Sequence, residues 1–448
     1  MFENVLGQDA SGRLEEDLER GQLAPAMLFT GPPASGKGTA ALELARVLSC
    51  GEESGGGSAA GFSGRGAWNC ACPSCVRHRY LVHQDLLLLG PRRFSAEIAA
   101  AGAGLLRESE SPSARVFFIR SIRKLLGRFS PVLWEDDPGF GKLGVLIQSI
   151  EEALDELARL REENGEHPGL EKLCSSLIKD ALKLEESGMA ETIPIAHIRR
   201  AAYWSRLAPS GRVKFILMEN AGRMQEGARN SLLKILEEPP ERAVIVLTTV
   251  SRGTILPTVQ SRLRHYRFTQ RDETTQSEVI RRIFRGVPGP SVPAYLDSFL
   301  PVSDEKLAAA AAFFAVSLAR LSAVALRRKG APLSSPLVAL GKRASAAAGS
   351  GAGDTRELVE GVLERTGNFG GRSFSRFLAV LLDLVSAAAR EDGVNSPVWI
   401  AYNEMWREAS GRAAEAVGVW NQTPALALEL MARGLYLAMT DGAAVHTA

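Results

Sequence analysis

The chain has 448 residues, more than a single hydrophobic core usually organises, so we expect two or three domains. Hydrophobic residues at 45% and charged residues at 23% are typical of a folded globular protein and exclude wholesale disorder. The 53 Lys and Arg against 51 Asp and Glu give a formal net charge of +2, so any contact with DNA needs a local basic patch or partner subunits. The first ten residues, MFENVLGQDA, have neither a basic region nor an apolar segment, and we expect a cytoplasmic protein.

Short apolar runs bounded by turn residues recur along the first 268 residues. Several are apolar at consecutive positions and have helical patterns between them, which is typical of a parallel sheet covered on both faces. The sequence therefore predicts a doubly wound α/β domain whose five parallel strands lie at 26–30, 85–89, 213–219, 243–249 and 265–268.

A glycine-rich loop joins the first strand to a helical run at 40–48. Glycine lets backbone N–H groups turn toward a phosphate, the helix N-terminus adds a favourable partial charge, and Lys37 can reach the outer phosphates. The position after the lysine, normally a Ser or Thr that binds Mg²⁺, is Gly38, and a hydroxyl comes one residue later. We predict an ATP-binding loop with altered Mg²⁺ placement, formed by Gly31, Pro32, Pro33, Ala34, Ser35, Gly36, Lys37, Gly38 and Thr39. The alternatives are a nucleoside monophosphate kinase and a glycine turn that only packs a helix on the sheet.

Four of the five cysteines fall in one stretch, at Cys50, Cys70, Cys72 and Cys75. Thiolates at this spacing can converge on one tetrahedral zinc ion, and a closed four-sulfur site leaves no position for a catalytic water. We therefore predict a structural zinc module at about 50–75, with a flexible glycine-rich linker within it; four unreactive buried thiols are the alternative. Cys174 stands alone in a helical pattern and is expected in the core.

About a hundred residues separate the second and third predicted strands, which is too long for a loop in a compact domain. Apolar residues at helical spacing predict a helical insertion at about 91–191. Its basic stretch at 115–128 could meet DNA or a partner, but we favour a solvated helix face.

After residue 268 the pattern is helical, with a small-residue stretch at 344–353 that indicates a hinge or exposed loop. The segment 307–326 is long enough to span a bilayer. It is mostly alanine and carries Arg320, a composition that favours a helix buried among other helices. We expect no membrane contact.

The loop and the cysteines together resemble the bacterial clamp-loader subunits of DNA polymerase III, AAA+ proteins with a zinc module after the phosphate-loop helix. The resemblance covers 1–268, which would be the nucleotide-binding domain, and it weakens after about 270. It implies a helical lid at 269–328 and a helical collar at 329–448 through which subunits form a ring. The segments that carry it are 2–8 (FENVLGQ), 83–85 (HQD), 231–240 (SLLKILEEPP) and 256–262 (LPTVQSR).

The resemblance also implies roles for single residues. Arg262 matches an arginine finger given in trans to the ATP site of a neighbouring subunit. Glu219 and Thr249 match positions that contact ATP. The family's second acid is Asn220 here, and an amide cannot act as a general base. Together with Gly38, this implies poor hydrolysis, typical of the delta-prime type; an ATP-hydrolysing gamma/tau-type motor is the alternative.

The implied function is to help load the sliding clamp onto primed DNA within the polymerase III holoenzyme. The implied partners are gamma/tau and delta subunits, with the clamp and primer-template DNA reached through the assembly. Structural Zn²⁺ and ATP with Mg²⁺ are the implied cofactors. A zinc-dependent DNA-binding protein with a vestigial nucleotide fold is a further alternative.

Overall fold

The computed structural model describes residues 1–51, 66–135, 137, 139–160, 169–190, 192–300, 302–348, 351–367, 371–392, 397–418 and 422–441. The chain divides into two compact units, Met1–Leu300 and Pro301–Ala448. Most of the predicted glycine-rich linker and part of the small-residue stretch at 344–353 lie outside the described residues.

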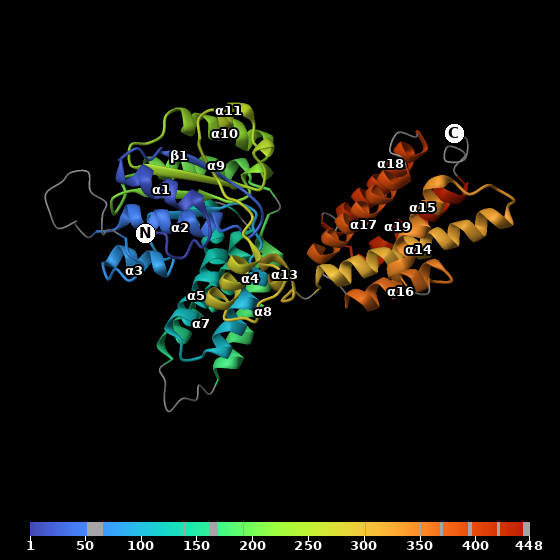
Figure 1. Ribbon diagram of the computed structural model, residues 1–448, viewed down its shortest axis with the longest axis horizontal. Helices are drawn as coiled ribbons and strands as arrows, with labels where there is room; N and C mark the ends of the chain where they lie inside the picture. Colours follow the sequence, from blue (N-terminus) through green and yellow to red (C-terminus); the bar gives the residue numbers. More distant parts are fainter. Residues whose placement is uncertain are drawn as a thin grey trace. The chain divides into compact units, whose positions relative to one another are not determined.

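The first unit is built on a five-stranded sheet in which every strand pair is parallel, in the order β2-β3-β4-β1-β5. Each strand lies within one residue of its predicted position, and the predicted α/β class is confirmed (Figure 1). The strands are β1 (Ala26–Thr30), β2 (Leu86–Leu89), β3 (Lys214–Met218), β4 (Ala243–Thr249) and β5 (Arg264–Arg267).

Helices cover both faces of this sheet. In β1, Met27 and Phe29 join the core on one face, whereas Ala26 and Leu28 join the core on the other. Because successive strand residues point to opposite faces, burying both faces requires apolar residues at consecutive positions. The covering helices are α1 (Asp9–Glu19) and α2 (Lys37–Ser49) on the first face and α9 (Ile195–Arg206) and α10 (Glu226–Glu237) on the second.

The predicted insertion is helical and has a core of its own. Phe118, Ile150 and Leu177 are fully buried in that core, as is Cys174, which confirms its expected place. The long helices α7 and α8 lie side by side (Figure 1). The elements are α4 (Ser95–Arg107), α5 (Pro112–Leu126), η1 (Gly127–Phe129), α6 (Pro131–Trp134), α7 (Phe140–Arg159) and α8 (Leu170–Gly188).

Two helices that follow the sheet, α12 (Glu273–Ile283) and α13 (Val292–Asp297), remain with the first unit. Ile280 and Val292 form a small buried cluster with Ala100 of α4. The last helices of this unit therefore pack against the insertion.

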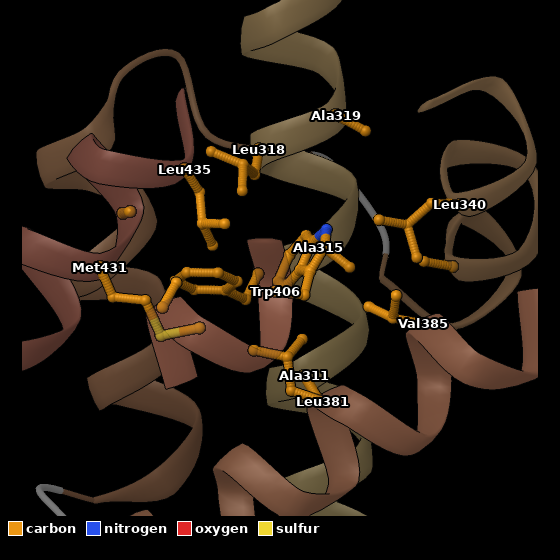
Figure 2. Packing of buried hydrophobic residues seen from close by; sticks show 14 of the residues in the cluster. Ala311, Ala315, Leu318, Ala319, Leu340, Leu381, Val385, Trp406, Met431 and Leu435 are labelled. Carbon is orange, nitrogen blue, oxygen red and sulfur yellow. The ribbon is translucent and has the colours of Figure 1, made fainter. Parts of the chain in front are cut away.

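The second unit is a helical bundle around α14 (Asp304–Arg328). Figure 2 shows Ala311 and Ala315 of α14 among larger side chains, including Leu381 and Trp406. Small residues on a central helix let neighbouring helices approach closely, so the alanine run serves packing. The surrounding helices are α15 (Ser335–Ala348), α16 (Thr355–Thr366), α17 (Gly371–Asp392), α18 (Pro397–Gly418) and α19 (Pro424–Asp441).

Helix α14 is long and apolar enough to cross a membrane, but 67% of its most apolar window is buried inside the protein. Leu307, Phe314 and Leu318 are all at most 1% exposed, as expected for a core helix. The two compact units meet at 300/301, within the predicted lid at 269–328, and the lid and collar assignment remains a prediction. The boundary lies there because α14 buries its apolar surface against the helices that follow it.

Candidate functional site

The glycine-rich loop runs from β1 into the first turn of α2. Gly36 has a φ of 95° and Ala34 a φ of 56°, so the chain enters the left-handed region twice within three residues. Gly31 passes so close to Phe268 that a Cβ atom at position 31 would lie 2.3 Å from the Phe268 carbonyl oxygen. Successive turns of this kind make concave surfaces of backbone N–H groups that suit anions.

Lys37 is held against this loop by its own hydrogen bonds. Its Nζ donates to the carbonyl oxygens of Gly31 and Pro32, each at 2.6 Å, and to Ser35 Oγ at 3.2 Å. Burial and the positive charge of Arg92 lower the pKa of Lys37 to about 8. An anionic ligand would stabilise the charged form of this partly buried ammonium group. The proposed role of Lys37 toward phosphate remains a prediction.

Glu219 directly follows β3 and has both carboxylate oxygens engaged. Oε1 accepts a hydrogen bond from Arg92 Nη1 at 2.7 Å, and Oε2 accepts one from Arg128. Burial raises the pKa of Glu219, but the two guanidinium groups outweigh it and lower that pKa to about 2. Asn220 lies in the left-handed region with a φ of 54°, and its Nδ2 donates to the Pro91 carbonyl oxygen at 2.8 Å. Asn220 therefore stabilises the backbone at the position where the resemblance led us to expect an acid.

Three basic side chains of the 115–128 stretch face inward. They are spaced by four residues, so they lie along one face of α5 and its continuation, and each is at most 8% exposed. The prediction of a solvated helix face is wrong at these three positions, because each cation forms an ion pair with a buried carboxylate. The spacing was visible in the sequence, but the partners were not. The ion pairs are Arg120 with Glu43, Lys124 with Glu97, and Arg128 with Glu219.

The four clustered cysteines come together in space. Their sulfur atoms all lie within 4.8 Å of one another, with Cys50 Sγ 3.8 Å from Cys70 Sγ and 3.9 Å from Cys72 Sγ. Four sulfurs around a tetrahedral zinc at about 2.3 Å are ~3.8 Å apart, so the donor set fits this ion. Cys75 lies in α3 (Pro73–Arg79), and its backbone N–H donates to Cys72 Sγ at 3.4 Å. The cluster can thus hold a structural metal ion.

A tryptophan joins this cysteine module to the rest of the unit. The guanidinium carbons of Arg46 and Arg120 lie 5.5 Å and 5.3 Å from the centre of the Trp68 ring. Arg46 also pairs with Glu43 at 2.7 Å and donates to the Ala67 carbonyl oxygen at 2.8 Å. Helix α2, the insertion and the module are therefore packed through one buried, charged group of residues.

Arg262 lies on the surface just after α11 (Pro257–Gln260), and its side chain is 35% exposed. Its Nη2 donates to Glu237 Oε1 at 2.8 Å, and its Nη1 donates to the Thr258 carbonyl oxygen at 2.7 Å. The guanidinium is thus within reach of a neighbouring molecule.

The two threonines predicted at the ATP site differ in their surroundings. Thr249 ends β4, and its carbonyl oxygen accepts from the Gly31 N–H at 3.3 Å, while its hydroxyl lies 2.8 Å from the Thr254 hydroxyl. Thr39 follows Gly38 in α2, so it projects about 100° further round the helix axis. Thr39 therefore does not occupy the direction that a side chain at position 38 would take.

A small, shallow cleft lies between the loop and the segment leading into α12 and α13. Arg271 borders the cleft and holds the loop, because its guanidinium donates to the carbonyl oxygens of Leu6 and Ala34. The cleft is lined by residues that include Pro33, Ala34, Ser35, Gln270, Arg271 and Gln276.

Comparisons with known proteins find similarity to subunits of DNA polymerase III. Residues 130–272 match the family model described as "DNA polymerase III, delta subunit". The chain is also similar to the DNA polymerase III subunit gamma/tau of Mycobacterium bovis and of Mycobacterium tuberculosis, at 27% identity over 104 residues. That match covers 23% of this chain and 18% of each relative, so the chain spans under a fifth of their length.

Among solved structures, one similar chain is a DNA polymerase III gamma subunit-related protein from Thermotoga maritima. It is 19% identical, with a TM-score of 0.25, and the match covers 56% of this chain and 81% of that one. The family match over 130–272 and the mycobacterial relatives support a clamp-loader-type subunit, similar at low identity to subunits of DNA polymerase III.

Proposed function

We propose that the chain is a cytoplasmic clamp-loader subunit of the replicative DNA polymerase III holoenzyme, which helps to place the sliding clamp on primed DNA. In this proposal it hydrolyses ATP poorly and gives Arg262 in trans to the ATP site of a neighbouring subunit. Its direct partners are gamma/tau and delta subunits, and the helices of the second unit act as the collar through which the ring assembles.

The observation that carries the proposal is the pairing of Glu219 with two arginines. A carboxylate that binds Mg²⁺ or activates water needs an oxygen available for that purpose. Both oxygens of Glu219 accept charge-assisted hydrogen bonds, and the following residue, Asn220, has no usable basicity. A chain with such a site is better suited to completing its neighbour's chemistry than to performing its own.

The place of Arg262 supports the second half of the proposal. Glu237, its carboxylate partner, is 50% exposed, and surface ion pairs are worth only ~0–1 kcal/mol. A γ-phosphate presented by a neighbouring subunit can therefore displace Glu237 at little cost. The arginine would then stabilise the charge that develops during phosphoryl transfer.

Reconstitution with gamma-type and delta-type subunits, clamp and primed DNA tests the proposal. The isolated chain should show negligible ATP turnover, and the full assembly should load clamps. Arg262→Ala should lower turnover at the one site that it completes by ~10³-fold or more, since an arginine finger usually contributes ~10³–10⁵ in kcat. Arg252→Ala removes another exposed arginine nearby and should leave turnover unchanged. Robust hydrolysis by the isolated chain would rule out this version of the function.

An ATP-hydrolysing motor is the second candidate, because the mycobacterial relatives are named gamma/tau subunits. The same assay separates the two: a motor should hydrolyse ATP with its own loop, and Lys37→Ala should abolish that turnover. Salt-sensitive binding of duplex DNA by the isolated chain would favour the DNA-binding alternative, but Arg120, Lys124 and Arg128 are buried and would not contribute to it.

A further inference from the structure

The side chain missing at position 38 has been replaced by an ion pair from elsewhere in the fold. A Cβ atom on Gly38 would lie 2.8 Å from Glu219 Oε1 and 3.0 Å from Arg92 Nη1. This is the position from which a Ser or Thr hydroxyl binds Mg²⁺ in phosphate loops. The space for the hydroxyl and its metal ion is therefore taken by a guanidinium and the carboxylate that it binds. Mg²⁺ does not fit the residues present here.

The network around this pair is rich in positive charge. Arg92 also donates to Glu97 at 2.6 Å, and Glu97 accepts from Lys124. Five cations against three carboxylates, Glu185 included, leave an excess of two positive charges around the loop and this network. The cations are Lys37, Arg92, Lys124, Arg128 and Arg271.

The network lacks hydrogen-bond acceptors as well as negative charge. Arg128 is only 4% exposed, yet its Nε and Nη1 have no hydrogen-bond partner within the described part of the chain. An arginine has five N–H donors, and Arg92 uses two of them on Glu219 and Glu97 while its side chain stays 31% exposed. Such a site disfavours a further cation and favours an anion that brings oxygen acceptors.

From these contacts we propose that the loop binds the phosphate chain of a nucleotide without a divalent metal ion, with the Arg92 guanidinium in the place of Mg²⁺. This inference rests on the nucleotide site of the proposed function and adds the chemical form of the ligand. Lys37 lies on the loop and Arg271 borders the adjoining cleft, so cations flank the loop on both sides. Guanidinium groups bind phosphate oxygens in fixed geometry and need no metal to do so.

Titration calorimetry on the full chain tests this inference, with ATP added either in EDTA or in millimolar Mg²⁺. Metal-free ATP should bind at least as tightly as Mg²⁺-bound ATP. Arg92→Ala should weaken metal-free binding by about tenfold or more, because a charge-assisted hydrogen bond is lost. Arg93→Ala removes the adjacent exposed arginine and should change the affinity less than about twofold.

Inorganic tripolyphosphate tests the phosphate chain without a base. Competition with ATP in EDTA would support the inference, and failure to compete would overturn it. Arg92→Lys keeps one positive charge and guards against a variant that does not fold; it should retain part of the metal-free affinity. Thermal unfolding of each variant shows whether the fold is kept.

Two calorimetry results would also overturn the inference: ATP binding that requires Mg²⁺, and no ATP binding in either condition. The second result leaves the proposed function standing if the chain still supports ATP turnover by its neighbour through Arg262. Conversely, tight metal-free binding together with no effect of Arg262→Ala on the assembly would retain this inference and reject the role in trans.

Discussion

Arg262 donates to Glu237 across 2.8 Å, and this pair joins the two sequence segments that most resemble the clamp-loader family. Glu237 ends α10 within SLLKILEEPP, whereas Arg262 closes LPTVQSR. The pair lies at the surface and holds the guanidinium in a defined position in the isolated chain. We therefore expect substitutions of Glu237 and of Arg262 to have different effects on ATP turnover.

Glu237→Ala should lower the free energy of unfolding by less than ~1 kcal/mol, since both side chains of the pair are partly exposed. It should also leave ATP turnover by the reconstituted assembly intact, because the carboxylate only holds the arginine in the absence of a neighbour. Urea denaturation and the turnover assay measure the two effects. If Glu237→Ala lowered ATP turnover as much as Arg262→Ala does, Glu237 would have a direct role in the ATP site of the neighbouring subunit.

The cysteine module should contain about one equivalent of zinc, measured by elemental analysis of protein prepared without chelator. Cys72→Ser with Cys75→Ser should remove the metal and lower the thermal unfolding midpoint of the first unit. Cys174→Ser provides the control, because that thiol is buried in the helical insertion and belongs to another core. Metal-free wild-type protein would contradict the zinc assignment.

Glu219 should contribute stability that depends on pH in a defined window. Its pKa falls from an ordinary value of 4.5 to about 2 in the folded chain. A lowered pKa gives stability that is fully present above pH 4.5 and is lost as the pH falls toward 2.

At pH 7, Glu219→Gln should destabilise the first unit by ~3–5 kcal/mol, because the buried Arg128 and the partly exposed Arg92 lose their carboxylate. The difference in free energy of unfolding between Glu219→Gln and the wild type should become smaller as the pH falls below 4.5. Chemical denaturation at several pH values measures this difference. A difference that does not depend on pH would mean that the carboxylate charge contributes nothing to the stability of the folded chain.

Phe314 should anchor the second unit. It is fully buried in α14, and its ring lies edge-on to Phe377 and Trp406 at 6.1 Å and 6.2 Å between ring centres. Phe314→Ala should destabilise this unit by ~3–5 kcal/mol, whereas Val324→Ala, at an exposed position of the same helix, should cost less than ~0.5 kcal/mol. Fluorescence of Trp399 and Trp406 during urea denaturation follows the transition. Equal effects of the two variants would contradict the central place of α14.

The sequence by itself determined the features that depend on local patterns. Consecutive apolar residues predicted β1 and β4, because a strand buried on both faces has no room for polar alternation. The closely spaced Cys70, Cys72 and Cys75 predicted a shared site, since short spacing limits how far apart their sulfurs can lie. Helical periodicity likewise predicted the insertion.

Only the tertiary structure decided which side chains meet. Arg92 and Glu219 are 127 residues apart, and no periodic pattern relates them. Sequence reasoning therefore identified Gly38 as a missing hydroxyl, but could not see the guanidinium that fills its space. The same holds for α14, whose alanine-rich surface is compatible with several neighbours until packing selects one set. Local propensity is encoded within a few residues, whereas charge pairing and helix packing depend on contacts that form only when the whole chain folds.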